Sequence, residues 1–386
     1  MTTAEAIRVL CDCARHVLNP DEIQQAKRRH AAVLDWADTD YLPLGGIGRA
    51  GALPEGLPDY HWAEQFDDPA RSFVMQMKGV IAQASTHSDC VPGLRADTGV
   101  INGPALFGVD YVVPEHTKPV VSRYVPKAAM RDFVLPDDIS SLGACPRIVE
   151  HMEFHQATLR AHGLDGRVDL FHCDTQGPFD IAAQTIGHEI FTEVYDDPAY
   201  VHHVMAQATK AYVALSRLCK RVAGDEDRPG NASWFWMNRG AVRMCDDSGI
   251  LLSAPLYAEF ALPYHRQAFE NLGGGWLHYC GGVRGGGRAE GLRLHDLYRS
   301  IPLMRGINFT TGRDFMGEIR RMIEGRVVFI GSPWRDEGED LKAFLKRVLS
   351  ACTEKRGLLL WGPSVSDEEK PSALGIWHRL QDERFK

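Results

Sequence analysis

The sequence predicts an α/β fold, a single (β/α)8 barrel of the TIM type that takes up residues 1–386. Two observations predict this fold. From about residue 165 onward, short apolar segments typical of buried strands alternate with longer segments in which apolar residues recur at helical spacing. Polar residues follow several of the strand segments, as in barrels whose catalytic groups lie at the carboxyl ends of the strands.

The elements are predicted in the following order. Residues 1–40 form peripheral helices, and a short buried strand at 41–46 leads into a glycine- and proline-rich loop. Further strands are expected at 168–173, 233–237, 242–245, 276–280, 304–309, 327–330 and 358–361. Helices are expected from Asp197-Pro198 onward and at 256–272, 292–300, 314–324, 339–355 and 366–380. This alternation favours a parallel sheet with helices outside it, either closed into a barrel or open and doubly wound.

The composition is that of an ordinary globular protein, since 44% of the 386 residues are hydrophobic. No segment approaches the roughly 20 uninterrupted apolar residues needed to cross a bilayer, and the N-terminus lacks the pattern of a signal peptide. The nine cysteines are an odd number spread along the chain, which indicates reduced thiols rather than a disulfide framework. We therefore expect a cytoplasmic protein that does not enter a membrane.

The charge argues against nucleic-acid binding. The formal net charge is −8, whereas binding to a polyanion needs a basic face that displaces counterions. The one local basic cluster is Lys27-Arg28-Arg29-His30, in a charged helical stretch. We interpret it as a solvated helix surface.

His278 and Cys280 are the leading candidates for a metal site. They stand two residues apart at the end of a predicted strand, so both side chains project to the same face. Imidazole and thiolate are common zinc ligands, and a catalytic zinc site takes three protein ligands and leaves one position open. A buried thiol beside a packed histidine is the alternative interpretation.

Three carboxylates are candidate catalytic groups: Asp89 after a helical stretch, Asp174 after the strand at 168–173, and Asp246 after the strand at 242–245. Carboxylates at strand ends serve as acids, bases or metal ligands, and they also cap helices. For Asp247, capping and function are equally plausible, and Asp180 is predicted to be an N-cap. We expect the three candidates to face one active-site mouth together with His278.

A glycine- and asparagine-rich loop at 97–108 is predicted to line a pocket. Arg95, Asp97 and Asn102 are its candidate substrate-binding residues. Arg95 and Asp97 could anchor an anionic substrate, or they could form an internal ion pair.

Several motifs resemble the uroporphyrinogen decarboxylase superfamily, in order and spacing, from about residue 85 to the C-terminus. The superfamily shares a (β/α)8 barrel and includes the porphyrinogen decarboxylase and zinc- and cobalamin-linked methyltransferases. The resemblance thus implies an enzyme of one of these kinds. The motifs are Ser88-Asp89 with Pro92, Gly177-Pro178-Phe179, residues 246–255 with Leu251-Leu252-Ser253, Pro263-Tyr264, and His278-Tyr279-Cys280-Gly281.

Within that superfamily the chain is more similar to the methyltransferases. Asp89 matches an aspartate that faces the pyrrole nitrogens of the substrate in the decarboxylase. The arginine-rich signature of the decarboxylase is missing from this chain. The active-site tyrosine of the decarboxylase corresponds to Gln184, which we assign to substrate binding. His278 and Cys280 match the first two zinc ligands of the methyltransferases. There zinc lowers the pKa of a substrate thiol, and the thiolate accepts a methyl group from a corrinoid.

The third zinc ligand of those methyltransferases is a cysteine after the last strand, where this chain has residues 361–366 without a cysteine. Cys173, Cys245 or Asp246 could complete the site, and so could water. Cys352 is close in sequence, but its place in an amphipathic segment predicts burial.

These observations give three hypotheses about function. The first is a zinc-dependent methyltransferase-like enzyme that transfers a methyl group to or from a corrinoid. The second is a metal-independent carboxy-lyase that uses Asp89 and Arg95. The third is a barrel without catalysis that binds a ligand or a corrinoid protein. A small-molecule substrate, a corrinoid-protein partner and, by analogy with the superfamily, a homodimer are the expected partners.

Overall fold

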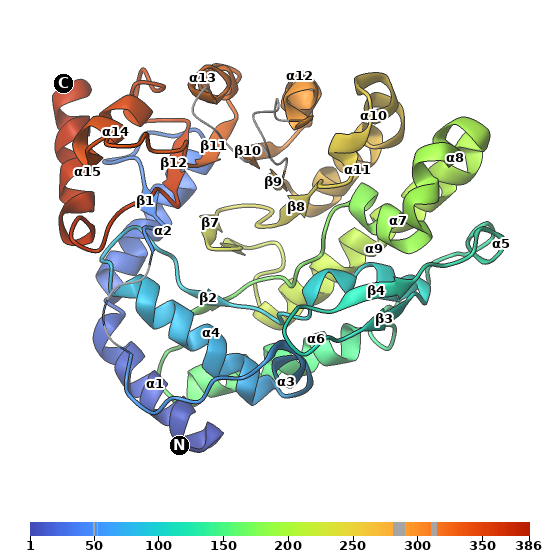
Figure 1. The fold of residues 1–386 in the computed structure, drawn as a ribbon, viewed down its shortest axis with the longest axis horizontal. Coiled ribbons are helices and arrows are strands. Elements are labelled where there is room, and N and C mark those ends of the chain that lie inside the picture. Colours follow the sequence, from blue (N-terminus) through green and yellow to red (C-terminus); the bar gives the residue numbers. More distant parts are fainter. Residues whose placement is uncertain (49–50, 52, 281–289, 310–314) are drawn as a thin grey trace.

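The structure is a computed structural model that describes residues 1–48, 51, 53–280, 290–309 and 315–386. Its main feature is a six-stranded parallel sheet, drawn as an arc in Figure 1 with helices α11 to α15 outside it. The order of its strands is β1 (Leu44–Gly45), β12 (Leu358–Trp361), β11 (Val328–Gly331), β10 (Met304–Phe309), β9 (Gly275–Tyr279) and β8 (Arg243–Cys245). The predicted α/β class is confirmed.

Two further strands, β2 (Gly93–Leu94) and β5 (Asp169–Leu170), form a separate parallel pair. In the described part of the chain, a few hydrogen bonds, and no continuous ladder, connect this pair to the main sheet on both sides. The Asp89 N–H group donates to the Leu44 carbonyl before β2 (2.8 Å), and the Arg243 N–H group donates to His172 Nε2 beside β5 (2.8 Å). The arrangement is barrel-like, but within the described residues no continuous ladder closes eight strands.

The helices follow the strands and begin at clear capping signals. Asp197 accepts a hydrogen bond from the Tyr200 N–H group at the start of α9, where Pro198 occupies the first turn. The helices from the middle of the chain onward are α6 (Cys145–Ala161), α7 (Pro178–Ile186), α8 (Ile190–Asp196), α9 (Pro198–Ala223), α10 (Ala254–Phe260), α11 (Leu262–Leu272), α12 (His295–Arg299), α13 (Met316–Glu324), α14 (Leu341–Leu349) and α15 (Lys370–Arg384).

Several predicted boundaries differ from the observed ones. The helix expected at 256–272 is two helices, because the chain bends at Ala261 and Pro263 begins a new first turn. The helix expected at 339–355 ends at Leu349, and the last helix begins at Lys370 rather than at 366. Gly281 and Asp314, which the predicted motif and helix include, lie outside the described residues.

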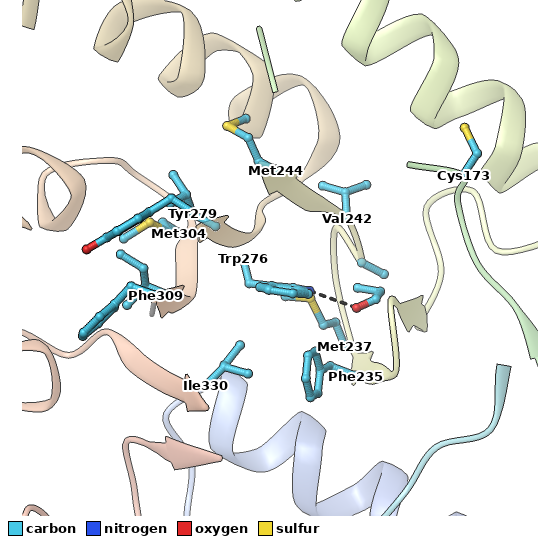
Figure 2. Packing of buried hydrophobic residues seen from close by; sticks show 14 of the residues in the cluster. Cys173, Phe235, Met237, Val242, Met244, Trp276, Tyr279, Met304, Phe309 and Ile330 are labelled. Atoms are coloured by element: carbon cyan, nitrogen blue, oxygen red, sulfur yellow. Dashed lines mark hydrogen bonds between the residues drawn. The ribbon is translucent and has the colours of Figure 1, made fainter. Parts of the chain in front are cut away.

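The strand expected at 233–237 is not part of the main sheet. Ser233 and Trp234 have φ angles of 54° and 78°, so they form a tight turn between β6 (Gly230–Ala232) and β7 (Phe235–Met237). The turn makes an antiparallel hairpin inside the arc (Figure 1). Trp276 points toward Phe235 and its Nε1–H group donates to the Ala232 carbonyl (2.9 Å), as Figure 2 shows.

A second antiparallel hairpin joins β3 (Asp110–Val112) to β4 (Val120–Arg123). It lies beside the short helix α3 (Trp62–Asp67) in Figure 1. The short helices η1 (Gly99–Ile101) and η2 (Pro104–Phe107) lead into it, and α5 (Lys127–Met130) follows it.

The N-terminal region forms α1 (Thr3–Val17) and α2 (Pro20–Leu34), as predicted, and α1 packs on α4 (Pro69–Ala84). The interpretation of the basic cluster in α2 as a solvated surface is wrong. Lys27, Arg29 and His30 are buried, and only Arg28 is exposed. The reason is that Lys27 Nζ pairs with Asp169 (2.8 Å) and Arg29 pairs with Asp89 (2.7 Å).

No helix in the described part of the chain is long and apolar enough to cross a membrane.

Candidate metal centre

Alternation along β8 and β9 decides which side chains face the interior of the arc. Cys245 lies opposite His278 in the parallel register. Trp276 points inward, whereas Tyr279 and Met244 point toward the helices (Figure 2). Since side chains alternate with period two, His278 shares the inward face with Trp276, and the same parity places Cys245 inward on β8.

His278, Cys280 and Asp247 form one cluster. Their potential ligand atoms all lie within 4.8 Å of one another. His278 Nε2 is 2.9 Å from Cys280 Sγ, and the Cys280 N–H group donates to Asp247 Oδ1 (2.6 Å). The prediction that His278 and Cys280 project to the same side is confirmed, and Asp247 is the third group.

The other candidates for a third ligand lie elsewhere. Among the described residues, neither Cys173 nor Cys245 belongs to this cluster. Cys173 Sγ instead lies 3.7 Å from the sulfur of Cys219 in the core. Cys352 is fully buried, as predicted.

Asn308 on β10 orients the His278 ring. Its Nδ2 group donates to the Ile330 carbonyl, which can only accept, so its Oδ1 atom must face His278 Nδ1. His278 therefore carries its proton on Nδ1 and presents the lone pair of Nε2 to Cys280. Metal-binding histidines are commonly fixed in this way by a partner of the second ring nitrogen.

Asp180 fixes the turn that carries Asp247. Its carboxylate accepts hydrogen bonds from the N–H groups of Asp247 (3.0 Å) and Ser248 (2.6 Å). The predicted N-cap role is wrong, because Asp180 lies in the third position of α7 and Gly177 precedes the helix. Burial and the neighbouring Asp247 raise the pKa of Asp180 to about 7.

Asp246 does not reach the cluster, contrary to the expectation that it faces the mouth. It is the first residue after β8 and is fully buried, and its Oδ2 atom accepts hydrogen bonds from Tyr257 (2.7 Å) and Tyr298 (2.9 Å). Its Oδ1 atom lies 3.7 Å from His265 Nε2. This placement continues the alternation of β8, on which Met244, two residues earlier, also points toward the helices.

Charged side chains lie beside the cluster, after β2 and β5 and on the first residue of β8. Asp174 accepts a hydrogen bond from Arg243 (2.7 Å) and lies 3.6 Å from Arg95. Arg95 also pairs with Asp97 (2.8 Å), which binds Lys118 Nζ at 2.9 Å. The structure thus brings Arg95, Asp97 and Asp174 together, but as an internal ion-pair network.

Asn102 and Gln184 belong to the same region. Asn102 Nδ2 donates to the Asp174 carbonyl (3.0 Å), and Gln184 Nε2 donates to Gln176 Oε1 (3.3 Å), whose amide reaches Asp174 (2.6 Å). Burial alone would raise the pKa of Asp174, but the guanidinium groups of Arg243 and Arg95 lower it below its ordinary value.

Asp89 does not join this region. It lies before β2, where Arg29 of α2 binds its Oδ1 atom (2.7 Å) and the Leu44 N–H group donates to its Oδ2 atom (3.0 Å). Both oxygens are thus used at the amino ends of β1 and β2. The expectation that Asp89 and Asp174 share one mouth is wrong, because Asp89 precedes its strand whereas Asp174 follows β5.

Burial and the neighbouring charges keep His278 neutral and Cys280 protonated. Burial and the positive charge of Arg243 lower the pKa of His278, so its imidazole is neutral at neutral pH. Burial and Asp247 raise the pKa of Cys280 to about 11, so its thiol keeps its proton and donates it toward His278 Nε2. Binding of a metal would require loss of this proton, as for other thiolate ligands.

A cavity of about 500 Å³ adjoins the cluster at the carboxyl ends of β10, β11 and β12. Asn308, whose side chain contacts His278, is one of its lining residues, and its volume is large enough for a small molecule. Its other lining residues include Phe309, Gly331, Trp334, Trp361 and Ser364.

The sequence interpretation missed Arg243 and Asn308, and it left Asp247 undecided. One signal could have found Asp247: residues 245 and 247 repeat the spacing of 278 and 280 on the neighbouring strand. Asn308 follows from no motif, because its role depends on the pairing of β10 with β9, which places it opposite His278.

Comparison with known proteins concerns the fold. No protein-family model matches the chain, and no curated protein matches it. Among solved structures, it is similar to a methyltransferase from Methanosarcina mazei, with a TM-score of 0.64 and 13% identity over 92% of this chain and 98% of that one. The likeness agrees with a barrel-like α/β fold, and the superfamily resemblance stays a prediction.

Proposed function

We propose that the protein is a zinc-dependent methyltransferase-like enzyme of the uroporphyrinogen decarboxylase superfamily. The observation that supports this most directly is the convergence of Asp247, His278 and Cys280 at the carboxyl ends of two adjacent strands. Enzymes with this type of fold place their catalytic groups at that end of the sheet. The fold likeness to a methyltransferase agrees with the proposal.

The residues fit zinc in number and in chemistry. Zinc binds thiolate, imidazole and carboxylate ligands at about 2.0 to 2.3 Å, and catalytic sites keep a fourth position open. One carboxylate oxygen, one imidazole nitrogen and one sulfur within 4.8 Å of one another meet this requirement after small shifts. Asn308 and Asp180 hold the imidazole and the carboxylate in place, which is the second layer that metal sites commonly have.

Zinc bound to these residues would lower the pKa of a substrate thiol, which makes the thiolate a better acceptor for a methyl group. The chain's own residues would bind and position the substrate. The cavity beside Asn308 would hold the body of the substrate. Two guanidinium groups and two carboxylates make the neighbouring wall charged but balanced in sign: Arg243, Arg95, Asp174 and Asp97. A corrinoid carried by a partner protein is the proposed methyl donor or acceptor.

Metal analysis of the full-length protein, purified without added zinc, tests the first half of the proposal. We expect about one tightly bound zinc ion per chain in the wild type. His278→Ala, Cys280→Ser and Asp247→Ala should lose it. Cys13→Ser, which changes a thiol on α1, should keep it. Equal zinc contents in the wild type and His278→Ala would overturn the proposal.

Methyl transfer tests the second half. The probe is methylcobalamin with a panel of small thiols, and the absorbance change of the cobalamin reports demethylation. We expect turnover in the wild type and in Cys13→Ser, and loss of turnover in His278→Ala. Bound zinc without turnover on any thiol would instead favour a barrel that binds a ligand without catalysis.

The metal-independent carboxy-lyase is not proposed. That hypothesis needs Asp89 and Arg95 around one substrate, whereas Asp89 is bound by Arg29 and Leu44, and Arg95 is bound by Asp97 and Asp174.

A further inference from the structure

A second group of metal-binding side chains lies on the surface, outside the candidate centre. The residue before α3, His61, meets Glu115 and His116 in the turn of the β3–β4 hairpin. Their potential ligand atoms also lie within 4.8 Å of one another. Two segments 54 residues apart in the sequence therefore contribute two imidazoles and one carboxylate to a single point.

The carboxylate of Glu115 faces both imidazoles, whose ring centres lie 4.7 Å apart. Its Oε1 atom is 3.7 Å from His61 Nε2, and its Oε2 atom is 3.7 Å from His116 Nε2. Both separations are too long for hydrogen bonds. In a tetrahedral zinc site with bonds of about 2.0 to 2.2 Å, neighbouring nitrogen and oxygen ligands are roughly 3.3 to 3.5 Å apart. The observed spacing is a few tenths of an ångström wider than that of a zinc site.

We propose that His61, Glu115 and His116 bind a divalent transition-metal ion of the zinc class. This site is independent of the proposed function at His278. The three side chains are 54%, 67% and 69% exposed, so the ion must order them on binding, and solvent completes its coordination. We therefore expect micromolar affinity, much weaker than that of a buried zinc site.

The position of the site gives it a structural consequence. The next residue after His61, Trp62, lies under the ammonium group of Lys118 (4.9 Å to the ring centre), two residues beyond His116. Lys118 in turn binds Asp97 beside the mouth (2.9 Å). A metal ion would therefore clamp the two segments that hold Lys118, and it would stiffen the hairpin next to the charged wall of the mouth.

Zinc titration by calorimetry on the full-length His278→Ala/Cys280→Ser protein tests the site, because this background removes two ligands of the other centre. We expect about one zinc ion per chain with micromolar affinity, and loss of that binding when His61→Ala and His116→Ala are added. His87→Ala is the matched control, since His87 is 70% exposed and faces a single carboxylate, Glu22, at 3.3 Å. It should leave the binding unchanged.

The proposal is overturned if zinc binding in this background is absent, or if His87→Ala weakens it as much as His61→Ala does. Copper(II) provides a second readout, because electron paramagnetic resonance should show two imidazole nitrogens that disappear in His61→Ala/His116→Ala. Hydrogen exchange of residues 110–123 should slow on addition of zinc only when both histidines are present. Exchange that slows equally without them would contradict the clamp.

Discussion

The two ends of the parallel strands both hold titratable side chains, but these side chains have different surroundings. At the carboxyl ends, His278 and Asp247 are held by Asn308 and Asp180 in a way that leaves ligand atoms facing Cys280. At the amino ends, Asp89 is bound through both oxygens by Arg29 and Leu44.

The comparison distinguishes a carboxylate that stabilises the fold from one that can bind a substrate or an ion. A carboxylate whose oxygens are both bound by fixed groups of the protein has no atom left for a substrate or an ion. Asp247 accepts one hydrogen bond through Oδ1, from Cys280, and still lies within reach of His278. Burial and charge alone therefore do not identify a functional carboxylate, and the count of occupied oxygens distinguishes Asp247 from Asp89.

The largest effect is expected at the amino ends. Arg29→Met would leave Asp89 buried without its cation, which costs about 3 to 5 kcal/mol of the free energy of unfolding. Urea denaturation measures this loss. The control is Arg28→Met, because the neighbouring Arg28 is exposed and should change the stability by less than about 0.5 kcal/mol.

Zinc affinity of folded Arg29→Met should match that of the wild type. Loss of zinc from the folded variant would contradict the inference that the amino ends of the strands do not support the metal centre. An unchanged midpoint of urea denaturation would contradict the expected loss of stability.

The sequence predicts the strand and helix alternation well from β8 onward, because each strand there is a short apolar segment followed by an amphipathic helix. It fails at residues 233–237, since periodicity does not distinguish a strand of the main sheet from a hairpin strand. It fails also for Lys27 and Arg29, whose partners Asp169 and Asp89 lie 142 and 60 residues away. Composition alone assigns such residues to the surface.

The candidate site was predictable only where it depends on neighbouring residues in the sequence. The pair His278 and Cys280 follows from alternation within one strand. Asn308 and Asp180 depend on the pairing of β9 with β10 and on the packing of α7 against the turn after β8. These are relations between distant segments, which a single sequence does not record.

The second prediction concerns the support of the metal centre. Asn308→Ala removes the acceptor that fixes His278 Nδ1, so zinc affinity should fall by about 10- to 100-fold. Competition with a chromophoric chelator measures the affinity. Asn271→Ala, on the exposed end of α11, should have no effect. Affinity equal to that of the wild type in Asn308→Ala would show that the ring is held by its other neighbours.

A third prediction tests whether a buried carboxylate that pairs with a cation always stabilises the fold. Asp225 pairs with Lys220 at 3.2 Å, yet burial raises its pKa to about 6. A carboxyl group whose pKa is raised in the folded state contributes stability at low pH and loses it as the pH rises through that value. The wild type should thus lose about 2 kcal/mol relative to Asp225→Asn between about pH 4.5 and pH 7. Urea denaturation at both pH values measures the difference, and parallel profiles would contradict the raised pKa.

The smallest effect is expected at Asp246, the neighbour of a proposed ligand. Tyr257 donates to Asp246 Oδ2, so the Tyr257 oxygen accepts from His265 Nδ1, and the lone pair of His265 Nε2 faces Asp246 Oδ1. Burial raises the pKa of Asp246 well above its ordinary value, which favours the neutral form of this carboxyl, and an amide has the same shape.

Asp246→Asn can keep both tyrosine hydrogen bonds through its oxygen and turn its NH2 group toward His265. The free energy of unfolding should change by less than about 1 kcal/mol, and zinc affinity should not change. Asp247→Asn changes the next residue, which belongs to the metal cluster. It should weaken zinc binding at least tenfold, because a neutral amide is a poorer ligand than a carboxylate. Equal zinc affinities in the two variants would contradict the assignment of Asp247, and not Asp246, as the metal ligand.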